Sequence, residues 1–192
     1  MAKRVCPWWL GYFLASPVRR WISDAPSTLL APYVREGMTV FEPGPGMGYF
    51  TLELARRVGA SGKVVAVDLQ PKMIAGLKRR AARAGLLDRV DARVASADSM
   101  NVADLAGKVD FTLAFALVHE MPSAANFFQE AAQVSKPGAL LLFAEPSGHV
   151  KQDEFDAELR HAADAGFAVA ALPPVRRSRA ALLRKSSVVS GH

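Results

Sequence analysis

The chain has 192 residues, 51% of them hydrophobic, which predicts one compact domain with a sizeable core. It contains no run of about 18 or more apolar residues, so the sequence predicts no membrane-spanning helix. The net charge of +6 is concentrated at the ends: residues 1–36 carry +3 and residues 173–192 carry +5, whereas residues 37–172 carry −2. Basic ends suit an anionic substrate, a nucleic acid or an acidic membrane surface, and solubility alone explains them equally well.

The N-terminal segment and the cysteine content bear on the cellular compartment. The first residues are basic and then apolar, but Pro7, Gly11 and Pro17 interrupt the apolar part and no convincing cleavage site follows. The single cysteine, Cys6, excludes an internal disulfide and fits a reducing compartment. The sequence therefore predicts a cytoplasmic protein.

The first half of the chain alternates strands with helices. Short apolar, β-branched runs predict strands, and apolar residues three or four positions apart predict helices. In chain order the predicted elements are a strand at 38–42, a helix at 49–58, a strand at 63–68, a helix at 71–84, a strand at 89–96 and a short helix at 99–106. Pro71 suits the first turn of its helix, and Gly85 ends it.

The second half continues the alternation and then departs from it. The predicted elements are a strand at 110–118, a helix at 123–135, a strand at 139–145, a helix at 153–166 and two strands at 167–172 and 179–184. Ser123 is the expected N-cap of its helix, and Lys136-Pro137-Gly138 is the expected stop. No helix separates the last two strands, so we expect them to pair antiparallel.

This order of elements predicts an α/β fold. We expect a doubly wound, mostly parallel seven-stranded sheet of Rossmann-like type with an antiparallel C-terminal hairpin. In such sheets, ligands bind beyond the carboxyl ends of the parallel strands. The loops expected there are 43–48, 68–71, 96–100, 114–121 and 145–150.

The loop after the first strand is rich in glycine, in the stretch VFEPGPGMGYFT at 40–51. Three glycines within five positions imply either a sharp turn or a ligand close to the backbone. A dinucleotide site has G-x-G-x-x-G with a pyrophosphate on the helix N-terminus, whereas the spacing here is G-P-G-M-G after Glu42. An acid at that place repels a pyrophosphate and suits a ligand with an ammonium group. The phosphate-binding motif G-x-x-x-x-G-K-[ST] is absent from the sequence.

In these motifs the sequence resembles the class I S-adenosylmethionine-dependent methyltransferases. EPGPGMG at 42–48 matches the acid-x-G-x-G-x-G motif of that family in full, with Glu where Asp is commoner. Asp68 and Asp98 stand after the second and third strands, where the family has acids for the ribose hydroxyls and the adenine amino group. The K-P-G before the fifth strand and the reversed C-terminal hairpin are further family traits. The resemblance covers about residues 30–185.

The resemblance implies S-adenosylmethionine (SAM) as the cofactor, and it implies where SAM binds. A helical lid segment at 1–36 would precede a SAM-binding domain at 37–186, with a tail at 187–192. The residues implied to bind SAM are Glu42, Gly44, Gly46 and Gly48 at the methionine portion, Asp68 at the ribose, Leu69, Asp98 and Ser99 at the adenine, and Ala114 and Phe115 at the amino-acid end. Asp98 is also explained as a simple turn residue.

Candidates for contact with the methyl acceptor lie on the same edge of the predicted sheet. His119, with Glu120 beside it in sequence, is the candidate general base, and His149 is a candidate substrate contact. Residues at these places also cap the following helices, so a structural role explains them as well. His161 falls within a helix and is expected at the surface.

The two ends of the chain supply further candidates. Trp8, Trp9 and Tyr12 would form an apolar wall against the acceptor, pack on the core as an ordinary helix, or insert into a membrane surface. Arg177 and Arg179 would share one face of the last strand, either to bind an anionic group or as charges on an edge strand. No His, Cys, Asp and Glu spacing indicates a metal site.

Together these features predict a SAM-dependent methyltransferase that acts on a small molecule with an apolar or aromatic part. The N-P-P-[YF] signature of amino-directed nucleic-acid enzymes is absent, and one cysteine cannot form an arsenite site. The nearest branch by general likeness includes the ubiquinone and menaquinone ring methyltransferases. Two alternatives stay open: an RNA or protein methyltransferase that uses the basic termini, and a non-catalytic SAM-binding module.

Overall fold

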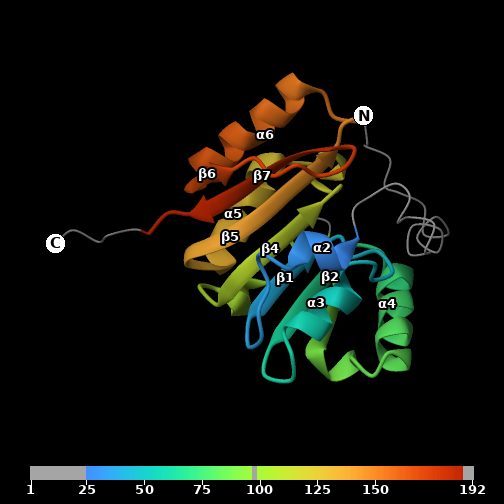
Figure 1. Cartoon of the computed structure of the whole chain (residues 1–192). Coiled ribbons are helices and arrows are strands. Elements are labelled where there is room, and N and C mark those ends of the chain that lie inside the picture. The colour runs from blue at the N-terminus through green and yellow to red at the C-terminus, as the bar shows by residue number, and fades with distance from the viewer. Residues whose placement is uncertain (1–24, 97–98, 188–192) are drawn as a thin grey trace.

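A seven-stranded sheet with the strand order β3-β2-β1-β4-β5-β7-β6 runs through the centre of the protein (Figure 1). The computed structural model describes residues 25–96 and 99–187. The strands are β1 Thr39–Pro43, β2 Lys63–Asp68, β3 Val90–Val94, β4 Val109–Phe115, β5 Ser135–Pro146, β6 Phe167–Ala171 and β7 Ser178–Lys185. Their number and order confirm the predicted α/β fold.

The sheet is parallel from β3 to β5 and antiparallel beyond it. β1 pairs with β2 on one side and with β4 on the other, both in parallel. The chain therefore winds outward to β3, returns to β4 and winds outward again, so a switch point lies between β1 and β4. β7 pairs antiparallel with both β5 and β6, which confirms the predicted hairpin.

Helices cover both faces of the sheet (Figure 1). They are α2 Pro26–Leu30, α3 Thr51–Arg57, α4 Pro71–Arg83, α5 Ala124–Val134 and α6 Gln152–Asp164, and the 3₁₀ turns are η2 Leu87–Arg89, η3 Ala103–Leu105 and η4 Val118–Glu120. Within the described part of the chain, no helix has the length and apolar character needed to cross a membrane.

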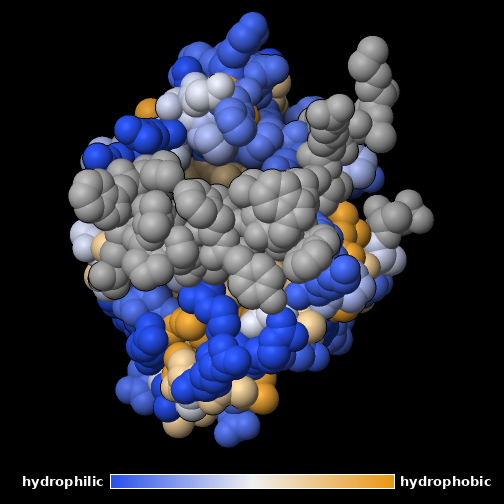
Figure 2. All heavy atoms as spheres, turned by 90° about the vertical axis from the view of Figure 1, so that its right-hand side faces the viewer, coloured by the Kyte–Doolittle hydropathy of each residue, from blue (hydrophilic) through white to orange (hydrophobic). Residues whose placement is uncertain are grey.

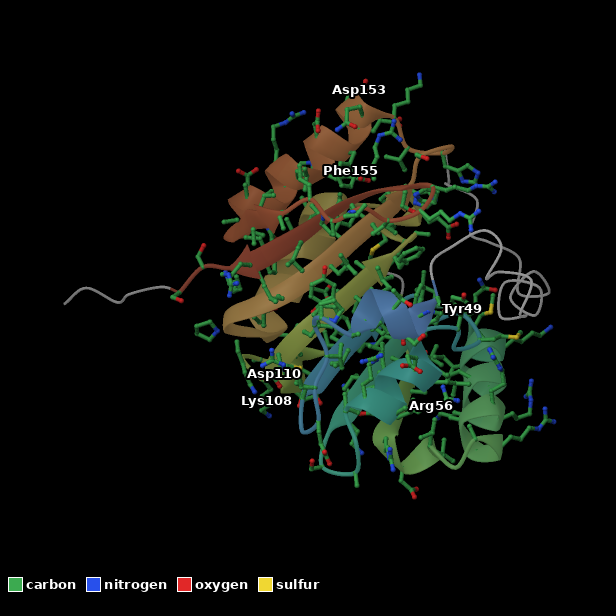
Figure 3. The ribbon with its side chains drawn as sticks, in the orientation of Figure 1. Tyr49, Arg56, Lys108, Asp110, Asp153 and Phe155 are labelled. Carbon is green, nitrogen blue, oxygen red and sulfur yellow. The ribbon has the colours of Figure 1, made fainter. Side chains whose placement is uncertain are left out.

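Alternate residues of each strand supply two separate cores, because successive side chains point to opposite faces of a sheet. Val40 of β1 packs in one core with buried residues of α2, α3 and α4. Its neighbour Phe41 packs in the other core with residues of α5 and α6. In this second core, Phe143 of β5 stacks on Phe155 of α6 with 5.0 Å between ring centroids, and Figure 3 shows Phe155 at α6. Full burial of one such ring contributes about 1.5–3 kcal/mol.

Local capping sets the start of the helices on the second face. Ser123 accepts a hydrogen bond at its hydroxyl from the backbone N–H of Asn126, which confirms it as the N-cap of α5. Glu154 in the first turn of α6 accepts one from the backbone N–H of Lys151. Each bond satisfies one N–H group that the first turn of a helix leaves without an intrahelical partner.

The predicted elements differ most from the structure at three places. The helix expected at 99–106 is only the 3₁₀ turn η3, and the strand expected at 110–118 ends at Phe115. Ala116 has a positive φ of 54°, which breaks the extended backbone there. β5 begins at Ser135 rather than at 139, and a register shift against β4 absorbs the Lys136-Pro137-Gly138 stretch.

Candidate active site

The three glycines after β1 all have backbone conformations that glycine favours. The φ values of Gly44, Gly46 and Gly48 are 68°, 54° and 86°. A Cβ at Gly44 would lie 2.7 Å from Leu117 Cδ1, and one at Gly48 would lie 2.5 Å from Leu77 Cδ1. A Cβ at Gly46 would meet nothing within 4 Å. Two of the glycines therefore allow close packing within the protein, while the backbone of Gly46 faces open space.

Asp68 ends β2 beside this loop. Its carboxylate accepts hydrogen bonds from the backbone N–H groups of Gln70, at 2.8 Å, and of Gly46. Burial raises the pKa of the Asp68 carboxyl above its ordinary value, although the two backbone donors oppose the shift. A carboxylate has about four acceptor sites, so Asp68 keeps capacity for further donors such as hydroxyl groups.

Glu42 lies in a cavity at the end of β1. The cavity is lined by Glu42, Pro43, Gly44, Pro45, Tyr49, Phe50, Leu113 and Phe115. The ring of Phe50 lies 4.9 Å from that of Tyr49 and 4.8 Å from that of Phe115, centroid to centroid. A buried carboxylate next to aromatic rings suits a cationic group. Figure 3 shows Tyr49 at this end of the sheet and Asp110 at the opposite end.

The last two residues of β4 divide between the two faces of the sheet. Phe115 lines the cavity beside Glu42. Ala114 is fully buried in the core formed with α5 and α6. The structure therefore brings Phe115, and not Ala114, together with the glycine loop.

The loop after β3 is held by α5. Glu130 Oε2 accepts hydrogen bonds from the Met100 backbone N–H, at 2.9 Å, and from the Ser99 hydroxyl, at 3.4 Å. Leu69, after β2, is 46% exposed and is thus accessible at the same edge. Asp98 lies outside the described residues. Sequence reasoning missed Glu130, because only the fold shows that α5 reaches this loop.

His119 has a different partner from the one that its sequence neighbourhood suggests. Its Nδ1 contacts Oε2 of Glu145, which ends the apolar run of β5. Its Nε2 lies 4.0 Å from Glu120 Oε1, so the expected proximity of Glu120 is present but secondary. Glu145 is fully buried, and its hydrogen bond raises the pKa of His119. An acid that ends a buried parallel strand was the available signal for Glu145 in the sequence.

His149 lies beside His119. The two imidazole rings are 6.1 Å apart at their centroids, with 75° between their planes. His149 follows β5 in a turn, in which its backbone N–H donates to the Pro146 carbonyl at 3.0 Å. The structure thus joins His119, His149 and Glu145 in one cluster. His161 is exposed, as predicted.

The arginines near the start of β7 do not share a strand face, contrary to expectation. Arg177 precedes the strand with a positive φ of 55°, in the turn that leads into β7. The Arg179 side chain donates to the carbonyls of Ser147 and Val150 and to Gln152 Oε1. β7 lies between β5 and β6, so it is not an edge strand either. Arg179 instead fastens the turn that carries His149.

Trp8, Trp9 and Tyr12, predicted as acceptor contacts, lie outside the described residues, as does Cys6. No group of three or more His, Cys, Asp and Glu side chains within residues 25–96 and 99–187 is arranged to hold a metal ion.

In Figure 1 the arrowhead of β4 points to the right, and Figure 2 shows the molecule from that side. Hydrophilic side chains predominate over the described surface that is visible there.

A sequence model of the methyltransferase-domain family matches residues 34–172. The chain belongs to this family. The match includes the glycine loop, Asp68 and both histidines of the cluster.

Known methyltransferases resemble the chain over much of its length. It is 28% identical over 112 residues to the ubiquinone/menaquinone biosynthesis C-methyltransferase of Hydrogenovibrio crunogenus, covering 58% of this chain and 43% of that protein. It is 28% identical over 110 residues to the catechol O-methyltransferase of Niastella koreensis, covering 56% and 48%. The chain thus spans about half the length of these relatives.

A solved SAM-dependent methyltransferase from Aquifex aeolicus has the same fold. It superposes with a TM-score of 0.81 at 24% identity, covering 94% of this chain and 98% of that one. The agreement extends over almost the whole of both chains.

The cofactor of this methyltransferase domain is SAM, and the residues present fit it. SAM carries two cationic groups and a ribose with two hydroxyls. Glu42 and Asp68 are carboxylates on neighbouring parallel strands, and Glu42 is accompanied by aromatic rings. The space over Gly46 leaves room for a ligand against the backbone. A dinucleotide pyrophosphate would instead meet two carboxylates.

Proposed function

We propose that the protein transfers a methyl group from SAM to a small molecule with an apolar or aromatic part. The observation that carries this proposal is the position of His119. Leu117, two residues before it, packs against Gly44 of the glycine loop, and Glu120, one residue after it, acts electrostatically on Asp68. The histidine cluster therefore borders the predicted cofactor site, as an acceptor site must.

The proposed SAM site uses residues from the ends of β1, β2 and β3. Gly44, Gly46 and Gly48 lie along the methionine portion, and Asp68 accepts hydrogen bonds from the ribose hydroxyls. Leu69, Asp98 and Ser99 frame the adenine. Glu42 and Phe115 border the amino-acid end, where Glu42 offsets the positive charge of the ammonium group; Ala114, buried on the other face of the sheet, is not part of this proposal. When bound, SAM supplies an electrophilic methyl group.

On the acceptor side, His119 takes a proton from the acceptor while His149 contacts it. Trp8, Trp9 and Tyr12 are proposed as an apolar wall of the acceptor site. The names of two relatives support small acceptors, because one is a catechol O-methyltransferase and the other acts in ubiquinone and menaquinone biosynthesis. Much of the acceleration would come from holding the acceptor in line with the methyl group.

The decisive experiment is a screen of acceptors with the purified chain and SAM. Phenols, quinols, thiols and amines are offered separately, and release of S-adenosylhomocysteine is measured. We expect turnover with at least one small acceptor, and none with total RNA. If RNA is instead methylated, with an affinity that falls steeply as salt is added, the small-molecule proposal is wrong. SAM binding without turnover of any acceptor would indicate a binding module.

A further inference from the structure

Glu145 is a buried carboxylate dedicated to the loop that carries His119. Its side chain is fully buried at the carboxyl end of β5. One oxygen, Oε1, accepts hydrogen bonds from the backbone N–H groups of Val118, at 2.7 Å, and His119, at 3.4 Å. The other oxygen, Oε2, contacts Nδ1 of His119. A buried charge is costly unless it is paired and hydrogen-bonded, so this arrangement fixes both the loop and the ring.

The contact with Glu145 determines which nitrogen of His119 remains for chemistry. A carboxylate is an acceptor, so Nδ1 holds its hydrogen toward Glu145 and Nε2 is the basic atom of the neutral ring. The His119 side chain is 21% exposed and thus accessible to a small molecule. Nε2 is turned toward the side of the ring where Glu120 lies 4.0 Å away.

The surroundings of His119 favour a neutral acceptor. Glu120 from η4, Glu145 from β5 and Glu158 from α6 all act on the imidazole with negative charge, and His149 is the other titratable group beside it. These carboxylates would repel an acceptor that arrives as a phosphate or carboxylate. They stabilise an imidazolium that forms when His119 takes a proton from a neutral acceptor.

His149 is held next to His119 by a separate contact. The guanidinium of Arg179 donates to the Ser147 carbonyl at 3.0 Å and to the Val150 carbonyl at 2.7 Å, on either side of His149. Arg179 is opposite Glu145 in the pairing of β5 with β7. The same pair of strands therefore positions both imidazoles, one through Glu145 and the other through Arg179.

We propose that Glu145 is the positioning residue of a His119 base, and that the acceptor is an acidic hydroxyl compound, a phenol or an enol. This inference rests on the proposed function and names its substrate class. A phenol has a pKa of about 10, so it attacks poorly until a base removes its proton. A neutral amine needs no base before attack, and a thiol, with a pKa of about 8.5, ionises readily by itself. Of these acceptors, a hydroxyl compound therefore depends most on a His–Glu pair to remove its proton.

The step balances without any further reactant. The acceptor O–H bond breaks, and its proton passes to Nε2 of His119. The acceptor oxygen forms a bond to the methyl carbon while the bond from that carbon to sulfur breaks, and the electron pair stays on sulfur. The products are a methyl ether, S-adenosylhomocysteine and a His119 imidazolium paired with the Glu145 carboxylate. The proton leaves to water after the product departs.

A pH titration of the histidine ring signals by NMR tests the pair without cofactor or acceptor. The wild-type His119 signal is expected to titrate above the ordinary value of about 6.5, and Glu145→Gln is expected to lower its midpoint. Glu120→Gln is the matched control, because it removes a carboxylate 4.0 Å from the same ring and should lower the midpoint less. An unchanged His119 midpoint in Glu145→Gln overturns the inference. If that variant does not fold, a wild-type midpoint at or below the ordinary value overturns it.

The kinetic test uses a simple phenol, an enolised 1,3-diketone, a primary amine and a thiol, each with SAM. We expect the hydroxyl compounds to react, His119→Gln to reduce the rate about 10²–10⁴-fold, and Glu145→Gln to shift the pH–rate midpoint downward. Turnover restricted to amines or thiols, or unaffected by His119→Gln, overturns the inference but leaves the methyltransferase proposal intact. Failure to bind SAM in calorimetry overturns the proposed function, whereas the NMR titration tests the pair independently.

Discussion

Residues 43–48 shape their part of the candidate site through backbone conformation, whereas residues 117–121 and 145–150 shape theirs through side-chain contacts. In the glycine loop, positive φ values and absent side chains create the surface, and Gly46 donates its N–H to Asp68. In the histidine cluster, Glu145 contacts His119 across 26 residues of sequence. Arg179 holds the turn of His149 through the carbonyls of Ser147 and Val150, which lie 32 and 29 residues away in sequence. Local sequence therefore determines the glycine loop, and the order of the strands determines the histidine cluster.

The largest expected effect concerns Asp68, because its carboxylate accepts the N–H of Gly46 and is the group proposed to bind the ribose. Asp68→Ala removes the carboxylate proposed to accept the ribose hydroxyls. Hydrogen bonds to charged groups contribute about 1.5–3 kcal/mol each, so SAM affinity should fall about 100-fold or more. Calorimetric titration with SAM measures this. Asp104→Ala is the control, since Asp104 pairs with Arg93. The SAM affinity of this variant should stay normal. Near-normal affinity in Asp68→Ala would remove Asp68 from the site.

The pairing of His119 with Glu145 predicts a pH-dependent stability. The pair raises the pKa of His119, so the native protein holds this proton more tightly than the unfolded chain does. The stabilisation is fully present below a pH of about 6.5 and is lost as the pH rises through the raised pKa. His119→Gln should therefore lower the free energy of unfolding by about 2 kcal/mol more at low pH than at high pH. Urea unfolding of both proteins at about pH 6 and pH 9 measures this, and a constant difference would contradict it.

Alanine substitutions at Gly46 and Gly107 distinguish a loss of folding stability from a loss of SAM affinity. Gly46 and Gly107 have φ values of 54° and 63°, and a Cβ at either would meet nothing within 4 Å. Alanine at each position should lower the free energy of unfolding by about 1–2 kcal/mol through backbone strain alone. Only Gly46→Ala should also weaken SAM binding, by about tenfold, because its Cβ would occupy the space proposed for the ligand. Equal SAM affinity in the two variants would show that Gly46 does not contact the cofactor.

The smallest effect is expected at Glu130, whose contacts to Ser99 and Met100 hold the loop after β3. Glu130→Gln keeps the shape but loses the charge-assisted bond, so SAM affinity should fall about threefold to tenfold. Gln133→Ala, at an exposed position on the same helix, is the control and should change nothing. If both variants bind SAM equally well, the loop is positioned by its own internal hydrogen bonds.

Much of the fold and half of the site follow from the sequence because their determinants are local. The strand after each helix, the cap at Ser123 and the acid at the end of β2 are each decided by a few adjacent residues. His119 was also predicted as a candidate from the sequence, since it follows a parallel strand. Its partner Glu145 was not predicted, because whether Glu120 or Glu145 contacts the His119 ring depends on the pairing of β4 with β5. Glu130 was missed and Arg179 was misjudged for the same reason: their partners are neighbours only in the folded chain.

The position of β7 has a consequence for how the domain can be divided. The family match ends at residue 172, before β7 begins, yet β7 lies inside the sheet between β5 and β6. A chain truncated after residue 172 would thus lose an interior strand, leave β6 without its hydrogen-bonding neighbour and expose the long edge of β5. β7 follows every other strand of the sheet in chain order, so the sheet, and the turn of His149 that Arg179 holds, can reach their final form only after β7 has been synthesised.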